Sequence, residues 1–386
     1  MAKRRLGDVC TVVTGSTPKT NIDEYWDGSI KWITPAELTE DTCILEDSVR
    51  KITDLAVIKT GLSSFPKGTV ILSSRAPIGK VAIAGCEMYC NQGFKNLICS
   101  DEIYNEYLFW FLRGKTEFLN SLGRGATFKE ISKSIVENIE IELPAIEIQK
   151  EIAQKLRKCS EIITLRKGEL LELDNLIKSR FVEMFGTLKD NNGRFDIVTI
   201  EEVCSLIKDG THQTPEYTED VVNGFKFLSS KDVMSQKIDW TDIRYIPVEL
   251  HEKLYSTIQP KRNDILMSKN GVNYGVAAVN DTDEVFDIYV SLALLRPMEV
   301  INPVYFRCAI NNPDTKRQFD SSIKGIGVPN LHLGEIKKTK IILPPLSMQN
   351  EFENFVIQVD KLKFEVQKSL DETQTLMDSL MQQYFG

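Results

Sequence analysis

The chain has 386 residues, of which 42% are hydrophobic and 26% charged, and its formal net charge at pH 7 is −8. This composition excludes the disordered and collagen-like classes, and the length predicts two or three domains. The negative charge argues against a protein that holds nucleic acid by its own bulk charge, and no apolar run approaches the roughly 18 residues that span a bilayer.

The N-terminus and the cysteines favour the cytoplasm. Basic residues at positions 3–5 are followed by Gly7 and Asp8 rather than by an apolar stretch, so we expect no signal peptide. None of the 8 cysteines forms a Cys-x-x-Cys pair, and the 3 histidines lie far along the chain from the close pair Cys86 and Cys90. We therefore expect no metal site, and free thiols in a reducing compartment.

Residues 1–143 are predicted to form a compact α/β or α+β domain. Short β-rich runs predict strands at 69–73 and 80–84, and residues 103–120 predict a helix. A last strand is expected at 139–143, directly before Pro144.

Residues 144–194 are predicted to form a helical spacer and the turn that ends it. From Ile152, steps of alternately four and three residues reach apolar side chains at 8 of 10 positions. Such a sustained heptad is typical of one face of a coiled coil. Pro144 stands where the helix begins and a missing amide costs least, and the turn follows at 186–194.

The second half of the chain repeats the first. Residues 143–149 (LPAIEIQ) recur as 343–349 (LPPLSMQ), and the Phe-Gly pair at 185–186 recurs at 385–386, both at an offset of 200. Nearer the start of each half the offset drifts to 194–195, with 70–75 (VILSSR) aligned to 264–269 (DILMSK). The chain is therefore predicted to be a tandem duplication, with a second domain at 195–343 and a second helical spacer at 344–386. The strands expected in the second domain are 225–229, 264–267, 276–279 and 339–343, with a helix near 303–320.

The second spacer has the same apolar period as the first, so we expect the two helices to pair as a coiled coil. The alternative is that each helix packs separately on its own domain. The residues predicted to form the paired face are Ile152, Leu156, Ile163, Leu170, Leu173, Ile177, Phe352, Val356, Val359, Val366, Leu370 and Met377.

One motif resembles a methyltransferase site. Residues 302–305 (NPVY) differ by one residue from the Asn-Pro-Pro-Tyr motif with which adenine-N6 methyltransferases hold a flipped base. The alternative is that Asn302 caps a helix whose first turn contains Pro303. No glycine-rich cofactor loop follows a strand upstream, so we favour the capping role.

A second motif fits the loose pattern of a metal-dependent nuclease, with Asp314, Glu335 and Lys337 as its members. In a chain with 26% charged residues such a pattern arises easily, and the first half has no counterpart to it. No phosphate-binding GxxxxGK[ST] loop and no credible Ser–His–Asp set is present. We therefore expect no catalytic residue in this chain.

Small polar loops occur at matching places in both halves. Residues 15–20 (GSTPKT) and 208–215 (KDGTHQTP) offer amides and hydroxyls to phosphates, and residues 73–80 and 268–275 carry side chains suited to base edges. Asn91 and Gln92 add amides that can read adenine. The alternative for any single loop is an ordinary solvated turn. The recurrence of these loops in both halves of the chain favours a binding site. The candidate DNA-binding residues are Thr17, Lys19, Thr20, Arg75, Lys80, Asn91, Gln92, Lys95, Arg124, Lys208, Thr211, His212, Gln213, Lys269, Asn270, Asn273, Tyr274 and Lys324.

With these motifs the chain resembles, over essentially its whole length, the specificity (S) subunit of type I restriction–modification systems. The most specific marks are the Leu-Pro-x-x-x-x-Gln helix entries, the Phe-Gly helix ends and the Gly-(x)-Thr-(x-x)-Pro loops. Residues 76–80 (APIGK) and 91–94 (NQGF) also resemble that family's target recognition domains. The second half departs from both at 270–275 and 289–292, and the two domains of this family normally differ because they read different sequences.

The resemblance implies a non-catalytic, DNA-reading subunit whose two target recognition domains are separated by a pair of long antiparallel coiled-coil helices. Each domain would bind one half of a bipartite site in double-stranded DNA. The helices would set the spacing and dock two modification (methyltransferase) subunits, which bind S-adenosylmethionine, and restriction subunits would join the full complex. We expect no cofactor and no membrane contact for the chain itself. Two alternatives stay open: a metal-dependent nuclease, and a coiled-coil scaffold that does not read DNA.

Overall fold

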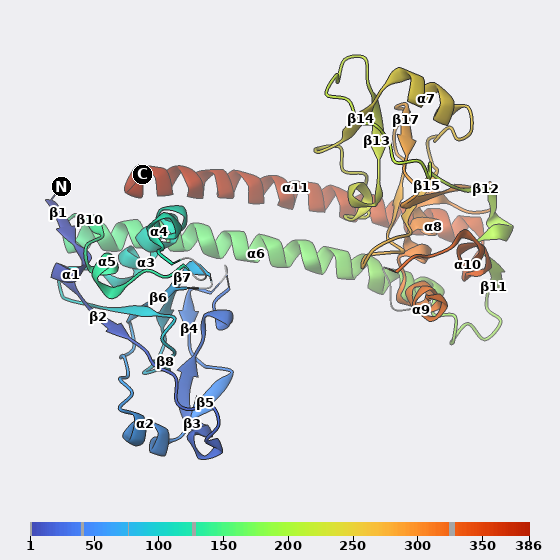
Figure 1. The fold of residues 1–386 in the computed structure, drawn as a ribbon. Helices are drawn as coiled ribbons and strands as arrows, with labels where there is room; N and C mark the ends of the chain where they lie inside the picture. The colour runs from blue at the N-terminus through green and yellow to red at the C-terminus, as the bar shows by residue number, and fades with distance from the viewer. Residues whose placement is uncertain (1, 40–41, 76, 126–128, 324–328) are drawn as a thin grey trace. The chain divides into compact units, whose positions relative to one another are not determined.

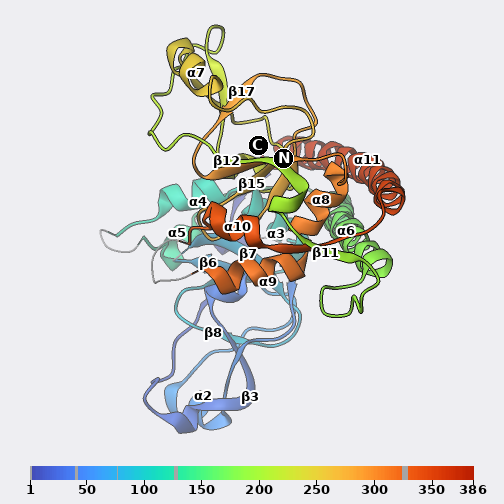
Figure 2. The ribbon, with the colours of Figure 1, turned by 90° about the vertical axis from the view of Figure 1, so that its right-hand side faces the viewer.

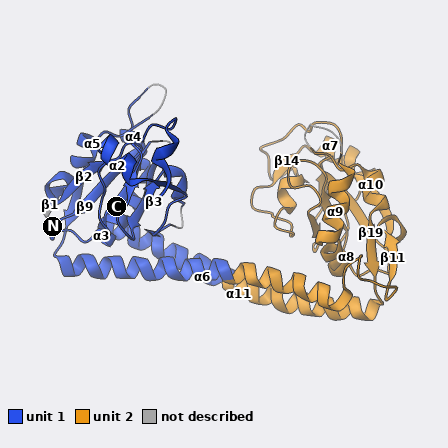
Figure 3. Ribbon diagram, turned by 90° about the horizontal axis from the view of Figure 1, so that it is seen from below, with its two compact units in different colours: residues 1–168, 367–386 blue, residues 169–366 orange. Residues whose placement is uncertain are grey.

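The computed structural model describes residues 2–39, 42–75, 77–125, 129–323 and 329–386. It divides into two compact units, unit 1 with Met1–Gly168 and Gln367–Gly386, and unit 2 with Glu169–Val366 (Figure 3). Two long helices, α6 (Ile146–Phe185) and α11 (Leu346–Phe385), each contribute one half to each unit. The predicted α/β class with two tandem globular domains and two long helices is confirmed.

The main sheet of unit 1 has five strands in the order β2-β9-β6-β7-β4. All neighbours are antiparallel except the short edge strand β4, which runs parallel to β7. Helices α3 and α4 pack against β7 (Figure 1). Helix α3 fills the core with aromatic side chains, and α4 adds Leu119. The bounds are β2 Cys10–Thr14, β4 Ile44–Leu45, β6 Val70–Ser74, β7 Ile78–Ala84, β9 Lys95–Cys99, α3 Asn105–Gly114 and α4 Thr116–Leu122.

A smaller sheet and a short ribbon complete unit 1. The smaller sheet has the order β5-β3-β8 and packs around Trp26 and Trp32 beside helix α2. The ribbon pairs β1 with β10, the strand directly before α6, and so ties the start of the chain to the start of that helix. The bounds are β1 Ala2–Arg5, α1 Leu6–Val9, β3 Trp26–Ile33, β5 Arg50–Ile52, α2 Asp54–Thr60, β8 Tyr89–Cys90, α5 Lys133–Glu137 and β10 Glu140–Leu143.

Unit 2 repeats this plan with sheets β12-β18-β15-β16 and β14-β13-β17 and the ribbon β11-β19. Helix α8 packs against β16 and β19 and shares a core with α6 and α11 (Figure 2). The strands are β11 Asp196–Thr199, β12 Cys204–Asp209, β13 Phe225–Leu228, β14 Arg244–Ile246, β15 Ile265–Ser268, β16 Ala277–Val279, β17 Phe286–Ile288, β18 Leu292–Pro297 and β19 Lys340–Leu343. The helices are α7 Val248–Tyr255, α8 Pro303–Ile310, α9 Pro313–Ser322 and α10 Leu333–Lys338.

Two sequence-based expectations need correction. The single helices expected near 103–120 and 303–320 are in each case two helices, α3–α4 and α8–α9. The break follows Gly114 in the first unit and lies at Asn311 and Asn312 in the second, and Asn312 caps α9 by accepting the amide of Asp314. Glycine and asparagine favour such breaks because they are poor helix formers and asparagine caps the next helix.

The alignment of 70–75 with 264–269 is also wrong by one residue. Ser74 donates its amide to Gly93 and accepts that of Ile131, whereas Lys269 donates to Ser291 and accepts from Leu331. These bonds occupy the same places in the two sheets, so Ser74 corresponds to Lys269 at an offset of 195. The shift arises because the sequence match was anchored on Ile71-Leu72, whereas the sheet pairs Val70 and Ile265 with equivalent neighbours.

The two long helices pair within each unit. In unit 1 the start of α6 shares a core with the end of α11, and in unit 2 the end of α6 shares a core with the start of α11, so the helices are antiparallel. All twelve predicted seam residues are buried or half-buried. The seam residues in the unit 1 core are Ile152, Leu156, Ile163, Leu370 and Met377, and those in the unit 2 core are Ile177, Phe352 and Val356.

The repeated motifs explain how the helices attach. Gln149 and Gln349 are fully buried; each accepts a backbone amide, from Tyr104 and Asn302 respectively, and donates to the carbonyl of the proline five residues earlier. The Phe-Gly motif supplies Phe385 to the core of unit 1 and Phe185 to that of unit 2. Within the described ranges, no helix combines the length and apolarity that a bilayer crossing needs.

Candidate functional site

Four polar segments meet at one end of the strands of the main sheet of unit 1, and we call their described residues the first loop cluster (residues 15–20, 74–75, 77–80, 91–95, 124–125 and 129–131). Ser74 donates its amide to Gly93 at 2.7 Å and accepts that of Ile131 at 3.0 Å. Thr17 donates its hydroxyl to Gln92 Oε1 at 2.5 Å, which joins the first loop to the third. Arg124 and Glu130 exchange backbone hydrogen bonds of 3.0 Å. The loops therefore form one bonded surface.

Gly15 allows the first of these loops to approach the third. A Cβ on Gly15 would lie 2.2 Å from the carbonyl oxygen of Cys90 and 2.4 Å from that of Asn91. Only glycine fits at such a distance. Burial raises the pKa of the Cys90 thiol to about 12, so this thiol is protonated at neutral pH and serves as packing.

Two tryptophans of the smaller sheet support the same loop. The indole of Trp32 donates to the carbonyl of Ser16 at 3.1 Å, and that of Trp26 donates to the carbonyl of Lys19 at 3.3 Å. Their rings meet edge to face with centroids 5.1 Å apart, and the Arg50 guanidinium lies 3.7 Å above the Trp26 ring. This rigid stack fixes the backbone that carries Thr17, Lys19 and Thr20.

A buried lysine lies beneath the first loop cluster. Lys95 is only 4% exposed, and its ammonium lies 3.0 Å from Glu130 Oε1 and 3.1 Å from Ser74 Oγ. Glu130 is thus held by its backbone and by its side chain. Lys95 therefore positions the loops from inside instead of facing outward as the sequence-based assignment expected.

Unit 2 has an equivalent second loop cluster (residues 208–215, 268–275, 289–292 and 329–331). Lys269 donates its amide to Ser291 at 2.8 Å, and Leu331 donates to Lys269 at 2.9 Å. Gly210 approaches the backbone as Gly15 does, since a Cβ there would lie 2.2 Å from the carbonyl oxygen of Ile288. The Lys269 ammonium is buried and lies 2.6 Å from Asp209 Oδ2.

Tyr274 is likewise engaged inside the second loop cluster. It is 9% exposed, its hydroxyl donates to Asp320 Oδ1 at 2.6 Å, and the Lys316 ammonium lies 3.5 Å from the centre of its ring. Hydrogen bonds from Lys316 and Tyr274 hold the pKa of Asp320 below its ordinary value. Tyr274 therefore braces loop 268–275 against α9.

The remaining candidates lie at or near the surface of the two clusters. Those that are exposed are Thr17, Lys19, Thr20, Gln92, Arg124, Lys208, His212, Gln213 and Asn273, and those that are half-buried are Arg75, Lys80, Asn91, Thr211 and Asn270. Lys80 uses its ammonium on the carbonyl of Leu38 at 2.6 Å, and Lys208 donates to the carbonyl of Thr257 at 3.3 Å. Lys324 lies outside the described residues.

Sequence reasoning did not identify the supports of these clusters. Glu130, Trp26 and Trp32 do not lie in the polar loops that recur in both halves, so recurrence gave no reason to assign them to the site. The available signal was an acidic residue close in sequence to a basic candidate, as Glu130 is to Arg124 and Asp209 is to Lys208.

Three residues of the motifs considered catalytic, Asn302, Tyr305 and Asp314, have structural roles. Asn302 caps α8 by accepting the amides of Val304 and Tyr305, and Tyr305 is fully buried with its hydroxyl donating to the carbonyl of Ile342. Asp314 accepts the amide of Leu188 and pairs with Arg317. Among the described residues no group of three or more His, Cys, Asp and Glu side chains could hold a metal ion.

The sequence matches the family described as "Type I restriction modification DNA specificity domain" over residues 1–175 and 192–373. The type I restriction enzyme MjaIX specificity subunit of Methanocaldococcus jannaschii is 30% identical, over 98% of this chain and 91% of its own length. The MjaVIII specificity subunit of the same organism is 24% identical, over 93% and 85%.

Solved structures share the fold. The S subunit of a type I restriction–modification system from M. genitalium superposes with a TM-score of 0.59 at 16% identity, covering 100% of this chain and 96% of its own. A chain from a study of complex assembly and conformational transition of the type I R-M system also gives 0.59, at 19% identity and with coverage of 100% and 97%.

Proposed function

Because the chain belongs to the type I restriction–modification DNA specificity family, its two tandem domains are DNA-specificity domains, and we propose that each reads one half of a bipartite site through its own loop cluster. Specificity subunits of this family are non-catalytic and work with the other subunits of the restriction–modification system.

The observation that carries the proposal is that the same loop cluster is built twice with different side chains. The backbone bonds of Ser74 and Lys269 are equivalent, and so are the close approaches of Gly15 and Gly210. The half-buried side chains that follow these two residues differ, with Arg75 in unit 1 and Asn270 at the corresponding place in unit 2. A shared backbone arrangement that carries different polar side chains suits two domains that recognise different base sequences.

The exposed candidates are of the types that contact DNA. Lysine and arginine bind phosphates and guanine edges, and asparagine and glutamine bind adenine edges. We assign direct contact to the exposed and half-buried candidates, among them Arg124 and Asn273. The buried residues Lys95, Lys269 and Tyr274 are assigned a positioning role.

The long helices are proposed to dock two modification subunits, which bind S-adenosylmethionine and methylate adenine. In support, both helices carry large apolar side chains that neither unit covers: Leu165, Leu171, Leu176, Leu362, Phe364 and Leu376 are 45–71% exposed. Apolar patches mark interaction surfaces, and the recurrence of such side chains along both helices favours one here. Partners that share the DNA contact also account for a net charge of −8. Restriction subunits would complete the assembly.

Two further assignments accompany this proposal. The chain itself would need no cofactor, and the recognition domains would extend over 1–143 and 195–343, with spacers at 144–194 and 344–386. All eight cysteines are free thiols in the described structure, which supports a reducing, cytoplasmic compartment.

The proposal is tested by producing the chain together with its modification subunits and mapping methylated adenines across a genome. The expected motif has two specified half-sites separated by a fixed number of unspecified base pairs. A single uninterrupted motif would contradict two readers. Methylation without sequence preference would favour the scaffold alternative.

A further inference from the structure

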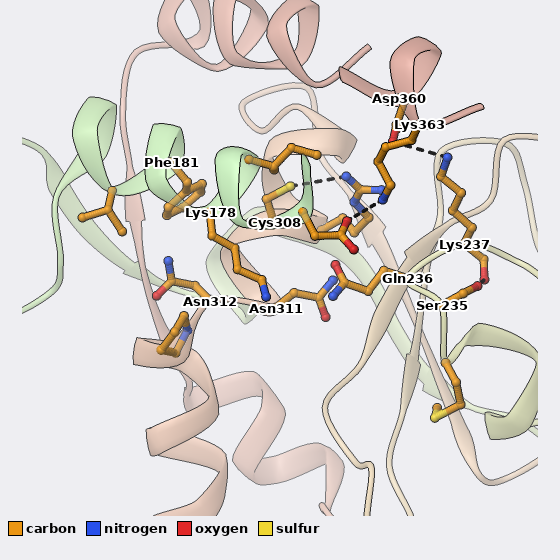
Figure 4. A pocket seen from close by; sticks show the side chains of 16 residues that line it. Lys178, Phe181, Ser235, Gln236, Lys237, Cys308, Asn311, Asn312, Asp360 and Lys363 are labelled. Atoms are coloured by element: carbon orange, nitrogen blue, oxygen red, sulfur yellow. Dashed lines mark hydrogen bonds and ion pairs between the residues drawn. The ribbon is translucent and has the colours of Figure 1, made fainter. Parts of the chain in front are cut away.

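Unit 2 contains a pocket of about 280 Å³, lined in part by charged side chains, that the recognition function does not use (Figure 4). It lies between α6, α8, α11 and the segment 234–237, away from the second loop cluster. Its charged lining comprises four basic residues, Lys178, Lys237, Arg307 and Lys363, and two acidic residues, Asp174 and Asp360.

Arg307 is the most unusual of these residues. It is 8% exposed, its Nη2 donates only to the Cys308 sulfur at 3.4 Å, and its buried Nε has no hydrogen-bond partner. Within the part of the chain that the structure describes, no carboxylate lies within ion-pair distance of this guanidinium. A buried cation is normally paired with an anion and fully hydrogen-bonded, because desolvation of a charge is costly. Asp360 and Asp174 lie close enough to favour the charged form of Arg307. Neither pairs with it directly, so the guanidinium lacks the hydrogen-bonded anion that its burial calls for.

The two acidic residues of the pocket are already neutralised. Lys363 forms an ion pair with Asp174, and Lys237 lies 3.3 Å from Asp360 Oδ1. These pairs leave Arg307 and Lys178 as the excess positive charge of the lining. In Figure 4 the side chains of Lys178 and Gln236 extend toward the same space as Asn311.

The repeat shows that the fold itself does not require these charges. Tyr107 and Tyr305 correspond, because each donates its hydroxyl to a carbonyl of the strand before a long helix. Two residues further on, Arg307 corresponds to Phe109, which is 1% exposed in the unit 1 core. On the long helices, Lys363 corresponds to the buried seam residue Ile163. Two apolar positions of one copy have thus become basic in the other, and both face one pocket.

We propose that this pocket binds a small phosphate-bearing anion, one per chain, with Arg307 as its principal ligand and Lys178 as the second. Arginine suits this role because its planar donors match the oxygens of a phosphate group. The pocket is smaller than most sites for drug-sized ligands, which begin at about 300 Å³, so it fits a phosphate monoester and not a dinucleotide. The site is separate from the loop clusters, so its failure would leave the proposed DNA reading untouched.

The probe is inorganic phosphate, titrated into the full chain at constant ionic strength with chloride as the compensating anion. Phosphate should raise the midpoint of thermal unfolding, and equilibrium dialysis should give one site per chain. Arg307→Met, which keeps an unbranched side chain, should weaken binding at least tenfold. Lys178→Ala alters an exposed residue and should weaken binding severalfold without affecting the fold. Lys155→Met, an exposed lysine of α6 in unit 1, is the control and should bind as the native chain does.

The variant Arg307→Phe restores the residue of the first copy. It should unfold at a higher temperature than the native chain without phosphate and should not respond to phosphate. The proposal would be overturned if phosphate did not shift the unfolding of the native chain. It would also be overturned if phosphate shifted the unfolding of Arg307→Met by the same amount. If Arg307→Met weakened only the association with modification subunits, the pocket would hold a carboxylate of a partner and the proposal would be wrong.

Discussion

The ammonium group of Lys95 lies 3.1 Å from the hydroxyl of Ser74, and Ser74 is the residue that corresponds in unit 1 to Lys269 in unit 2. In unit 1 the buried lysine, Lys95, comes from the neighbouring strand and lies beside Ser74. In unit 2 the buried lysine, Lys269, occupies the position of Ser74 itself. In each case a carboxylate of the loop cluster pairs with it, Glu130 or Asp209. Both loop clusters therefore have a buried ammonium group beneath them, although residues at different positions supply it.

Removing this cation should be more damaging in unit 2 than in unit 1. The side chains of Lys269 and Asp209 are 5% and 17% exposed, so Lys269→Met leaves a largely buried carboxylate and should cost about 3 kcal/mol of unfolding free energy. Glu130 is 40% exposed and can be hydrated, so Lys95→Met should cost only about 1 kcal/mol. Urea unfolding of the full chain measures both. Asp209→Asn added to Lys269→Met should recover part of the loss, and equal costs in the two units would contradict this account.

Gly15→Ala and Gly210→Ala should each disturb one loop cluster. Each new Cβ would lie 2.2 Å from a backbone carbonyl oxygen, so the loop must move, at a typical cost of about 1–3 kcal/mol. Gly168→Ala is the matched control, because nothing lies within 4 Å of its Cβ and alanine favours a helix by up to ~1 kcal/mol. Thermal unfolding should fall for the first two variants and rise for the third. Unchanged stability in Gly15→Ala would show that the loop tolerates separation from Asn91.

Arg75→Ala and Asn273→Ala should each affect one half-site. A lost base contact costs about 1–3 kcal/mol of discrimination at the base it reads, whereas a lost phosphate contact weakens all sequences alike. With the modification subunits present, mapping of methylated adenines should show relaxed preference in one half of the motif for Arg75→Ala and in the other half for Asn273→Ala. Relaxation of both halves by either variant would refute the assignment of one reader to each unit.

The helices should act as a ruler for the spacing of the half-sites. Inserting seven residues after Gly168 and seven after Val366 lengthens both helices by about 10 Å, close to three base-pair steps at ~3.4 Å each. Seven residues turn the helix to within ~20° of two full turns, so the apolar seam is kept. The unspecified stretch of the motif should grow by about three base pairs with both half-sites unchanged.

Insertions of five residues at the same two places provide the control. They turn the seam by about 140° and should abolish helix pairing and methylation. Methylated-site mapping and circular dichroism distinguish the two insertion variants. An active seven-residue variant with unchanged spacing would show that something other than helix length sets the distance.

The long helices could be predicted closely because heptads and proline are strong local signals. The predicted spacers began at Pro144 and Pro344, and the helices begin two residues later, at Ile146 and Leu346. The sharing of each helix between both units was beyond local signals, since it depends on contacts such as that of Phe385 with Tyr107.

The positions of the loop clusters in the chain could be predicted, but the burial of their lysines and the residues that support them could not. Recurrence located the loops, since both copies keep the glycine that the close approach requires. Which lysines are buried depends on the sheet register, and one residue of misalignment matched Arg75 with Lys269 when Ser74 is the true counterpart. The Trp26–Trp32 support belongs to a sheet without a sequence pattern of its own, because β3 alternates irregularly between buried and exposed residues.

Residues 367–386 belong to unit 1, so this unit cannot be completed during synthesis until they have been made. The Phe385 ring packs on Tyr107 with centroids 5.2 Å apart, and Met377 lies in the same core. A ribosome elongating at ~5–20 residues per second makes residues 367–386 roughly 10–40 s after residue 168. During that interval the first domain has an open apolar face on the nascent chain. A premature stop within the last segment therefore injures the domain that was made first.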